Sequence, residues 1–184
     1  MLMARNVLSL SLFFLLACAC AGSLYAADES ARELEWTDLV PEDYNPDAIF
    51  EQYQEQYNLD QLEDDDPVVV ELAKKLDEVW KQAPVNPELN GQRVRLPGFV
   101  LPVETDGEAT SSFLLVPYYG ACIHVPPPPA NQTVYVTMQA GKGAVIRKLF
   151  DTVWVTGVIR TEPLSTDLAE AGYTMEAVLV EPYD

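Results

Sequence analysis

Short runs in which hydrophobic and polar residues alternate dominate the second half of the chain. They occupy residues 93–104, 111–120, 133–139, 151–162 and 173–183, and Gly, Pro or polar residues separate them. Valine, tyrosine and leucine are frequent in these runs, which is typical of β-strands. Successive side chains of a strand point to opposite faces, so the alternation in TVYVTM and TVWVTGVIRT predicts sheets with one solvent-facing side.

The number and spacing of these runs predict how the strands assemble. Five or six antiparallel strands in this order favour a small Greek-key barrel resembling the OB fold. Pro97-Gly98 and Gly157 interrupt two of the runs and predict the bulges or bends that a small barrel requires. The expected fold class is α+β, with N-terminal helices packed on the barrel.

Two segments before residue 90 have hydrophobic residues at helical spacing. The first begins at Asn45-Pro46, a favoured N-cap followed by proline at the first helical position, and continues through DAIFEQYQEQYN. The second begins in the same way at Asp66-Pro67, and Pro84 ends it. Its hydrophobic residues predict a stripe that belongs to the core: Val69, Leu72, Ala73, Leu76, Val79 and Trp80.

The chain is expected to have three parts. Residues 1–27 combine Arg5 with the apolar run LSLSLFFLLACACAG and small residues, which is typical of a secretory signal. Alternatively, LLAC is an imperfect lipobox and Cys18 carries a lipid. Residues 28–66 predict an extended arm, a helix and an acidic linker, and residues 67–184 predict a helix followed by the barrel. Both interpretations of the leader place the mature domain outside the cytoplasm.

Charge and cysteine content restrict the function classes. The formal net charge is −18, from 29 acidic and 11 basic residues. Such a surface repels nucleic-acid phosphates, so we expect no nucleic-acid partner. Cys18 and Cys20 lie in the leader, which leaves Cys122 as the single thiol of the mature domain, without an intramolecular disulfide partner. An inert, buried cysteine is one interpretation of Cys122, and a functional thiol is the other.

The segment YGACIHVPPPPANQ, residues 119–132, contains Cys122 and the single histidine of the chain, His124. If this segment is extended, both side chains point to one face with Cβ atoms roughly 6 to 7 Å apart. A metal ion can bridge that separation, so we predict a transition-metal site, with zinc favoured over copper. The remaining ligands are expected from elsewhere in the fold, from water, or from a second copy in a homodimer. Glu104 is the preferred additional ligand, whereas Met138 would suit copper but fits the core better.

Four consecutive prolines follow this pair. Such a run adopts a stiff polyproline II rod without backbone donors, which predicts either a rigid wall behind the ligands or a surface for a partner protein. On the second interpretation, the contact residues are Pro126, Pro127, Pro128, Pro129, Asn131 and Gln132. Asn131 and Gln132 have the alternative role of capping the end of the rod.

Catalytic interpretations have less support. Cys122 and His124 are the minimal pair of a thiol nucleophile and its base, but on one strand they would need unusual side-chain rotation to share a hydrogen bond. The sequence contains no CxxC pair, no GxSxG elbow, no Walker loop and no dinucleotide fingerprint. Binding is therefore favoured over catalysis, and no catalytic residue is assigned.

Several motifs together resemble one family. GQRVRLPGFVLPVE, FLLVPYYGACIHVPPPPANQ, VWVTGVIRTE and YTMEAVLVEPY are similar to motifs of the bacterial domain of unknown function DUF3299, a family of small secreted proteins or lipoproteins. The resemblance covers residues 68–184 and leaves residues 1–67 outside. It implies a protein of the Gram-negative periplasm, soluble or lipid-anchored, and it marks Cys122, His124, Asn131 and Gln132 as a candidate site.

The same resemblance implies a biological setting. Some members are encoded beside a MacB-like ABC transporter in zinc-responsive operons, which implies a role in zinc or metallophore handling with an inner-membrane transporter as partner. Two functions follow as expectations. One is an extracytoplasmic accessory protein that binds zinc. The other is a metal-free adaptor of the transporter.

Overall fold

A computed structural model describes residues 30–183 except 46, 107–108, 124–126, 141–143, 145 and 147. Of residues 104–106 and 109 it describes the backbone alone. His124, Pro126 and the leader with Cys18 therefore lie outside the described residues.

The described chain contains helices, 3₁₀ turns and strands in the following order. They are β1 (Arg32–Glu33), η1 (Trp36–Leu39), α1 (Ala48–Tyr57), η2 (Leu59–Gln61), α2 (Pro67–Lys81), η3 (Pro87–Leu89), β2 (Arg93–Asp106), β3 (Ala109–Val116), η4 (Ala130–Gln132), β4 (Val134–Met138), β5 (Thr152–Arg160), β6 (Leu164–Ser165), β7 (Glu170–Ala171) and β8 (Tyr173–Pro182).

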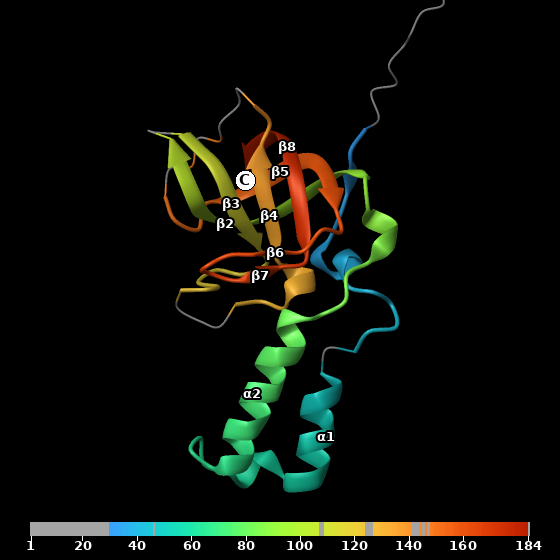
Figure 1. The fold of residues 1–184 in the computed structure, drawn as a ribbon, viewed down its shortest axis with the longest axis vertical. Coiled ribbons are helices and arrows are strands. Elements are labelled where there is room, and N and C mark those ends of the chain that lie inside the picture. The colour runs from blue at the N-terminus through green and yellow to red at the C-terminus, as the bar shows by residue number, and fades with distance from the viewer. Residues whose placement is uncertain are drawn as a thin grey trace, which may run out of the picture.

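Five long strands close into a barrel in the order β2-β3-β4-β8-β5, because β5 also pairs with β2 (Figure 1). The α+β class is thus confirmed, and each of the five predicted strand runs overlaps one of these strands. One expectation is wrong: β4 and β8 pair in parallel, so the barrel is not antiparallel throughout. These two strands are not consecutive, and the long connection through β5, β6 and β7 allows the parallel arrangement.

One of the two predicted glycine positions lies at an irregularity of the barrel. The register between β5 and β8 shifts between Thr156 and Gly157, as expected for a bulge. A side chain at position 157 would collide with the backbone oxygen of Glu176. Pro97-Gly98 causes no register shift but immediately precedes Phe99, where the pairing of β2 passes from β5 to β3. Glycine is therefore required sterically at position 157.

The N-terminal arm is part of the core rather than an appendage. Leu34 and Leu39 are 1% and 0% exposed and join the main hydrophobic cluster inside the barrel. The buried hydroxyl of Tyr173 donates to the carbonyl of Leu39 at 2.5 Å and accepts from the backbone N–H of Asn86 at 2.6 Å. One tyrosine thus ties the arm and the segment after α2 to the barrel strand β8.

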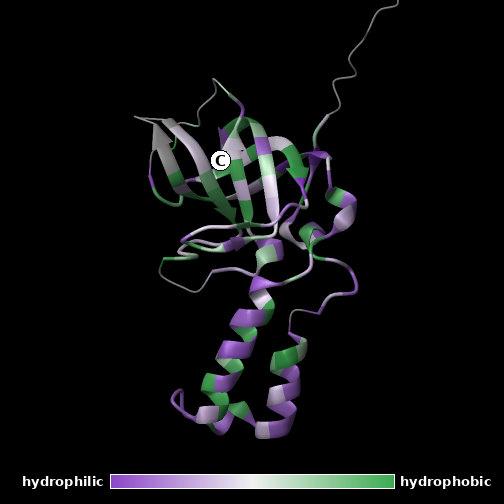
Figure 2. Ribbon diagram, in the orientation of Figure 1, coloured by the Kyte–Doolittle hydropathy of each residue, from purple (hydrophilic) through white to green (hydrophobic). Residues whose placement is uncertain are grey.

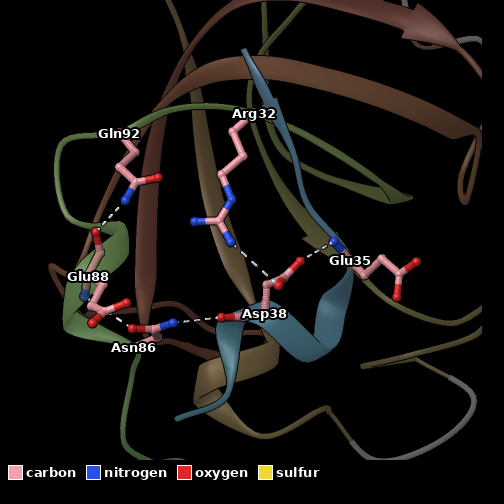
Figure 3. A network of polar contacts seen from close by, with 6 residues as sticks. All are labelled: Arg32, Glu35, Asp38, Asn86, Glu88 and Gln92. Atoms are coloured by element: carbon pink, nitrogen blue, oxygen red, sulfur yellow. Dashed lines mark hydrogen bonds and ion pairs between the residues drawn. The ribbon is translucent and has the colours of Figure 1, made fainter. Parts of the chain in front are cut away.

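A surface network reinforces this attachment (Figure 3). The Asp38 carboxylate accepts from the backbone N–H of Glu35 at 2.8 Å and lies 3.7 Å from the guanidinium of Arg32. The Asn86 amide donates to the Asp38 carbonyl at 2.9 Å, and its oxygen caps η3 by accepting from the N–H of Glu88. These contacts join η1 to η3 across more than forty residues of sequence.

The two helices form a hairpin that extends away from the barrel (Figure 1). α2 begins as predicted, since Asp66 accepts from the N–H of Val68 at 2.8 Å and proline occupies the first position. α1 begins later than predicted: Asp47 holds the N-cap position, and Asn45 accepts from the N–H of Asp47. Within the described residues, no helix is both long and apolar enough to cross a membrane.

Candidate functional site

The thiol of Cys122 sits in a turn, not in a strand. Ala121 forms a single bridge, and Cys122 and Ile123 then turn, with φ of 65° at Cys122. The preceding Gly120 also has positive φ, of 85°. The extended geometry from which we predicted a shared face for Cys122 and His124 is therefore wrong at Cys122. The left-handed region is uncommon for a residue with a Cβ, and such strain is often found at functional positions.

The surroundings of Cys122 are apolar. It is free and half-buried, and it packs against a small cluster that includes Ala121, Phe150 and Ala169. Burial raises the pKa of the Cys122 thiol to about 11. Burial also raises the pKa of Tyr118, with a smaller contribution from Cys122. A thiol in such surroundings is protonated at neutral pH and is therefore a poor nucleophile.

Two of the other predicted metal ligands have no side chain among the described residues. His124 lies outside them, and Glu104 is described by its backbone alone, in β2 beside a register shift. Met138 packs half-buried against the main core cluster, as its alternative interpretation predicted. Within the part of the chain that is described, no group of three or more His, Cys, Asp or Glu residues could hold a metal ion.

The proline segment separates into residues with different surroundings. Pro128 is buried, whereas Pro127 and Pro129 are half-buried. Asn131 is 1% exposed, and its amide donates to the carbonyl of Pro84 at 2.9 Å. Asn131 therefore fastens the proline segment to the stretch that follows α2. Of the predicted partner contacts, Pro127, Pro129 and Gln132 retain some exposure.

A cavity of about 660 Å³ lies between α2, the prolines and the turn that joins β6 to β7. Its apolar lining comes from all three segments: Ala73, Leu76, Trp80, Pro127, Pro128, Leu168 and Ala169. The charged residues of its described lining are Asp77, Lys81, Asp167 and Glu170. The sequence interpretation did not find this cavity, although two of its residues are the predicted prolines.

The helix wall of the cavity is the stripe that we predicted to be core. Of its residues, only Leu72 is fully buried, at 5% exposed, while Leu76 and Trp80 are half-buried and Ala73 is exposed. The core prediction is therefore wrong for most of the stripe. The hairpin stands away from the barrel, so α1 covers one part of the stripe and the cavity lies over another. In Figure 2 the ribbon of α2 alternates between hydrophilic and hydrophobic residues.

Two details define the walls further. The Trp80 indole N–H is enclosed and has no hydrogen-bond partner among the described residues. Opposite the helix, the Thr166 hydroxyl fixes the β6–β7 turn by donating to the Ala169 carbonyl at 2.9 Å and accepting from the N–H groups of Leu168 and Ala169. One wall of the cavity is thus closed by local hydrogen bonds, and the other carries Trp80, whose enclosed indole N–H has no partner among the described residues.

Comparison with known proteins gives one family. Residues 36–182 match the family model described as "Protein of unknown function (DUF3299)". The crystal structure of a DUF3299 family protein from Pseudomonas aeruginosa PAO1 is 37% identical, with a TM-score of 0.62, and the match covers 84% of this chain and 97% of that chain. Because the family match begins at residue 36, our expectation that residues 36–67 lie outside the family is wrong.

Two further comparisons add less. The structure of an OBody bound to hen egg-white lysozyme is 16% identical with a TM-score of 0.37, and it covers 54% of this chain and 88% of that chain. A similarity this low carries no conclusion. The comparison with curated proteins found no match.

Proposed function

The chain belongs to the DUF3299 family, whose function is unknown, and from this premise we propose that it is a non-catalytic interaction subunit that acts outside the cytoplasm. The observation that carries the proposal is the cavity between α2, Pro127 and Pro128, and the β6–β7 turn. Large, well-formed apolar cavities with a few polar groups are the usual location of binding sites. The expected partner is an inner-membrane ABC transporter, as the family resemblance implies.

The chemistry of the described residues supports binding over catalysis. The one described thiol has a raised pKa of about 11, which is opposite to the shift that activates a nucleophile. Among the described residues, the lining of the cavity contains carboxylates and one lysine but no histidine, cysteine or serine. The half-buried apolar stripe on α2 is typical of a surface that a partner covers.

A photocrosslinking experiment in the native periplasm tests this proposal. A benzophenone amino acid replaces Leu76 in the cavity or, as a control, the exposed Leu179 on β8. We expect an adduct from position 76 that mass spectrometry identifies as a transporter permease, and no such adduct from position 179. Absence of any adduct specific to position 76, in protein shown to be folded, would refute the interaction role.

Zinc binding at Cys122 and His124 is the second candidate function, with copper less favoured. Two observations favour it: Cys122 is a free thiol, and its backbone has the positive φ often found at functional positions. Metal binding would have to displace the thiol proton, because zinc binds the thiolate. The described residues do not complete such a site, so further ligands must come from elsewhere, including a second copy of the chain.

Native mass spectrometry of the reduced protein titrated with zinc tests this second candidate. A stoichiometric adduct is expected in the wild type and is expected to be lost in the double variant Cys122→Ser, His124→Ala. An adduct with the mass of two chains would indicate a shared site. Equal zinc retention by both proteins would exclude these two residues as the ligands.

We also propose that the barrel is of the OB type. Two observations support this. The first is the strand order β2-β3-β4-β8-β5, which returns to β2. The second is the position of β8, which lies between β4 and β5 and pairs in parallel with β4. Solution of an experimental structure and comparison of its strand tilt and shear with OB barrels would test this assignment.

A further inference from the structure

We propose that the cavity binds a peptide segment of a partner protein in which an arginine or lysine lies beside a large apolar side chain. This inference rests on the proposed interaction function and specifies the chemistry of the segment. It is drawn from the charges and walls of the cavity and from the enclosed indole N–H of Trp80, which is unpaired among the described residues.

The charges of the lining favour a cation. Among the described lining residues, three carboxylates, those of Asp77, Asp167 and Glu170, accompany a single ammonium group, that of Lys81. The Lys81 Nζ already lies 2.7 Å from an Asp77 oxygen, and this hydrogen bond, with the charges of Asp77 and Glu170, raises the pKa of Lys81. The exposed Asp167 carboxylate forms no ion pair with any described residue. An incoming cation therefore meets uncompensated negative charge, whereas an anion would meet an ammonium that is already paired.

The walls favour an apolar group beside that cation. Leu76, Trp80, Pro127 and Leu168 present apolar surface, and its removal from water stabilises the complex in proportion to the area covered. The planar guanidinium of arginine can stack on an indole and also bind carboxylates with paired hydrogen bonds. A bare metal ion or a free amine would leave this surface wet. A volume of about 660 Å³ is also far larger than either needs.

The indole of Trp80 favours a peptide over a free basic molecule. Its N–H is enclosed and unpaired among the described residues, which costs free energy. Every residue of a peptide carries a carbonyl acceptor. A carbonyl that meets this donor, after rotation of the indole toward the cavity, recovers part of that cost.

Panning of a random heptapeptide phage library against the mature protein tests the inference. Phage that bind the Leu76→Glu variant are removed first, so that only peptides dependent on the cavity are kept. We expect the retained peptides to combine Arg or Lys with a neighbouring Leu, Ile, Phe or Trp. Circular dichroism of the variant confirms that it is folded before it is used.

Binding of the strongest selected peptide is then measured by fluorescence anisotropy. The double variant Asp167→Asn, Glu170→Gln is expected to weaken binding about two- to fivefold for each carboxylate neutralised, and added salt is expected to reduce the difference. The matched control is Asp64→Asn, Asp65→Asn, which makes the same charge change in the exposed loop before α2 and should leave binding unchanged.

The outcomes separate this inference from the proposed function. Cavity-dependent peptides that are acidic or uncharged would overturn the basic character of the segment and leave the interaction role in place. Equal weakening of peptide binding by Asp167→Asn, Glu170→Gln and by Asp64→Asn, Asp65→Asn would also overturn the basic character of the segment. In that case the overall charge of the protein, and not the carboxylates of the cavity, would determine binding. Failure to retain any cavity-dependent peptide would overturn the inference, while the crosslinking at position 76 tests the interaction role independently.

Discussion

The rate at which Cys122 reacts with a disulfide reagent should depend on pH in the way expected of a buried thiol. Burial disfavours the charged thiolate and raises the pKa of this thiol from 9.0 to about 11. At about pH 8 the thiolate fraction is then about a hundredfold lower than in an unburied thiol. The thiolate of a thiol with a higher pKa is also a better nucleophile, so its rate constant for exchange is higher by a factor of roughly 6 to 10. This gain offsets part of the lower thiolate fraction. The net expectation is a disulfide-exchange rate about tenfold below that of the unfolded chain.

The assay follows thiopyridone release when the reduced mature protein reacts with dithiodipyridine between about pH 7 and pH 10. The same chain unfolded in urea provides the reference rate, and Cys122→Ser provides the background. The rate of the folded protein should still rise about tenfold per pH unit near pH 10, while that of the unfolded chain should be half-maximal near pH 9, the unburied pKa. A folded-state rate that is half-maximal at or below about pH 9 would refute the burial argument and revive the thiol-enzyme hypothesis.

Three further predictions concern the fold. Tyr173→Phe removes the hydroxyl that donates to Leu39, and it should lower the free energy of unfolding in urea by about 1–3 kcal/mol; an unchanged midpoint would contradict this. Burial raises the pKa of Tyr173 to about 12, so wild-type stability should fall as the pH rises from about 10, the unfolded value, and this fall should be smaller in the Phe variant. Gly157→Ala places a methyl group against the Glu176 carbonyl and should lower the free energy of unfolding, measured by thermal denaturation, by about 1–3 kcal/mol. An unchanged free energy would show that the bulge can shift to make room for the methyl group. Asp66→Ala removes the N-cap of α2 and should cost about 1 kcal/mol, measured by the same urea titration; a full loss of folding would mean that Asp66 does more than cap the helix.

The barrel strands and the start of α2 were predictable because their signals are local. Alternation alone identifies a half-buried strand, and Asp66-Pro67 defines a helix start whatever follows it. The two-residue strands β1, β6 and β7 were not predicted. Such short segments have no period to detect, and β1 carries the exposed residues Arg32 and Glu33, which pair with β2 only in the folded chain.

The misinterpretation of Cys122 has a physical cause. The residues before it form the strand β3, and the sequence pattern alone does not show where the extended backbone ends. Gly120, with φ of 85°, was the available signal, because a glycine that follows a strand often takes a conformation closed to other residues. The α2 stripe was misassigned for a different reason. Its spacing predicts an apolar face, but which neighbour covers that face depends on the hairpin's position relative to the barrel.

The structure divides the segment of residues 119–132 between two surroundings that meet inside the protein. Cys122 and Leu168 both pack against the small apolar cluster that includes Ala169. Leu168 and Ala169 also line the cavity, together with Pro127 and Pro128. The β6–β7 turn is therefore shared between the thiol cluster and the cavity. Occupation of the cavity should consequently change the access of reagents to Cys122, so a selected peptide that slows disulfide exchange at this thiol would link the two halves of the motif. A peptide that binds without altering the exchange rate would show that the halves act separately, and zinc binding and partner binding would then have to be explained as independent properties.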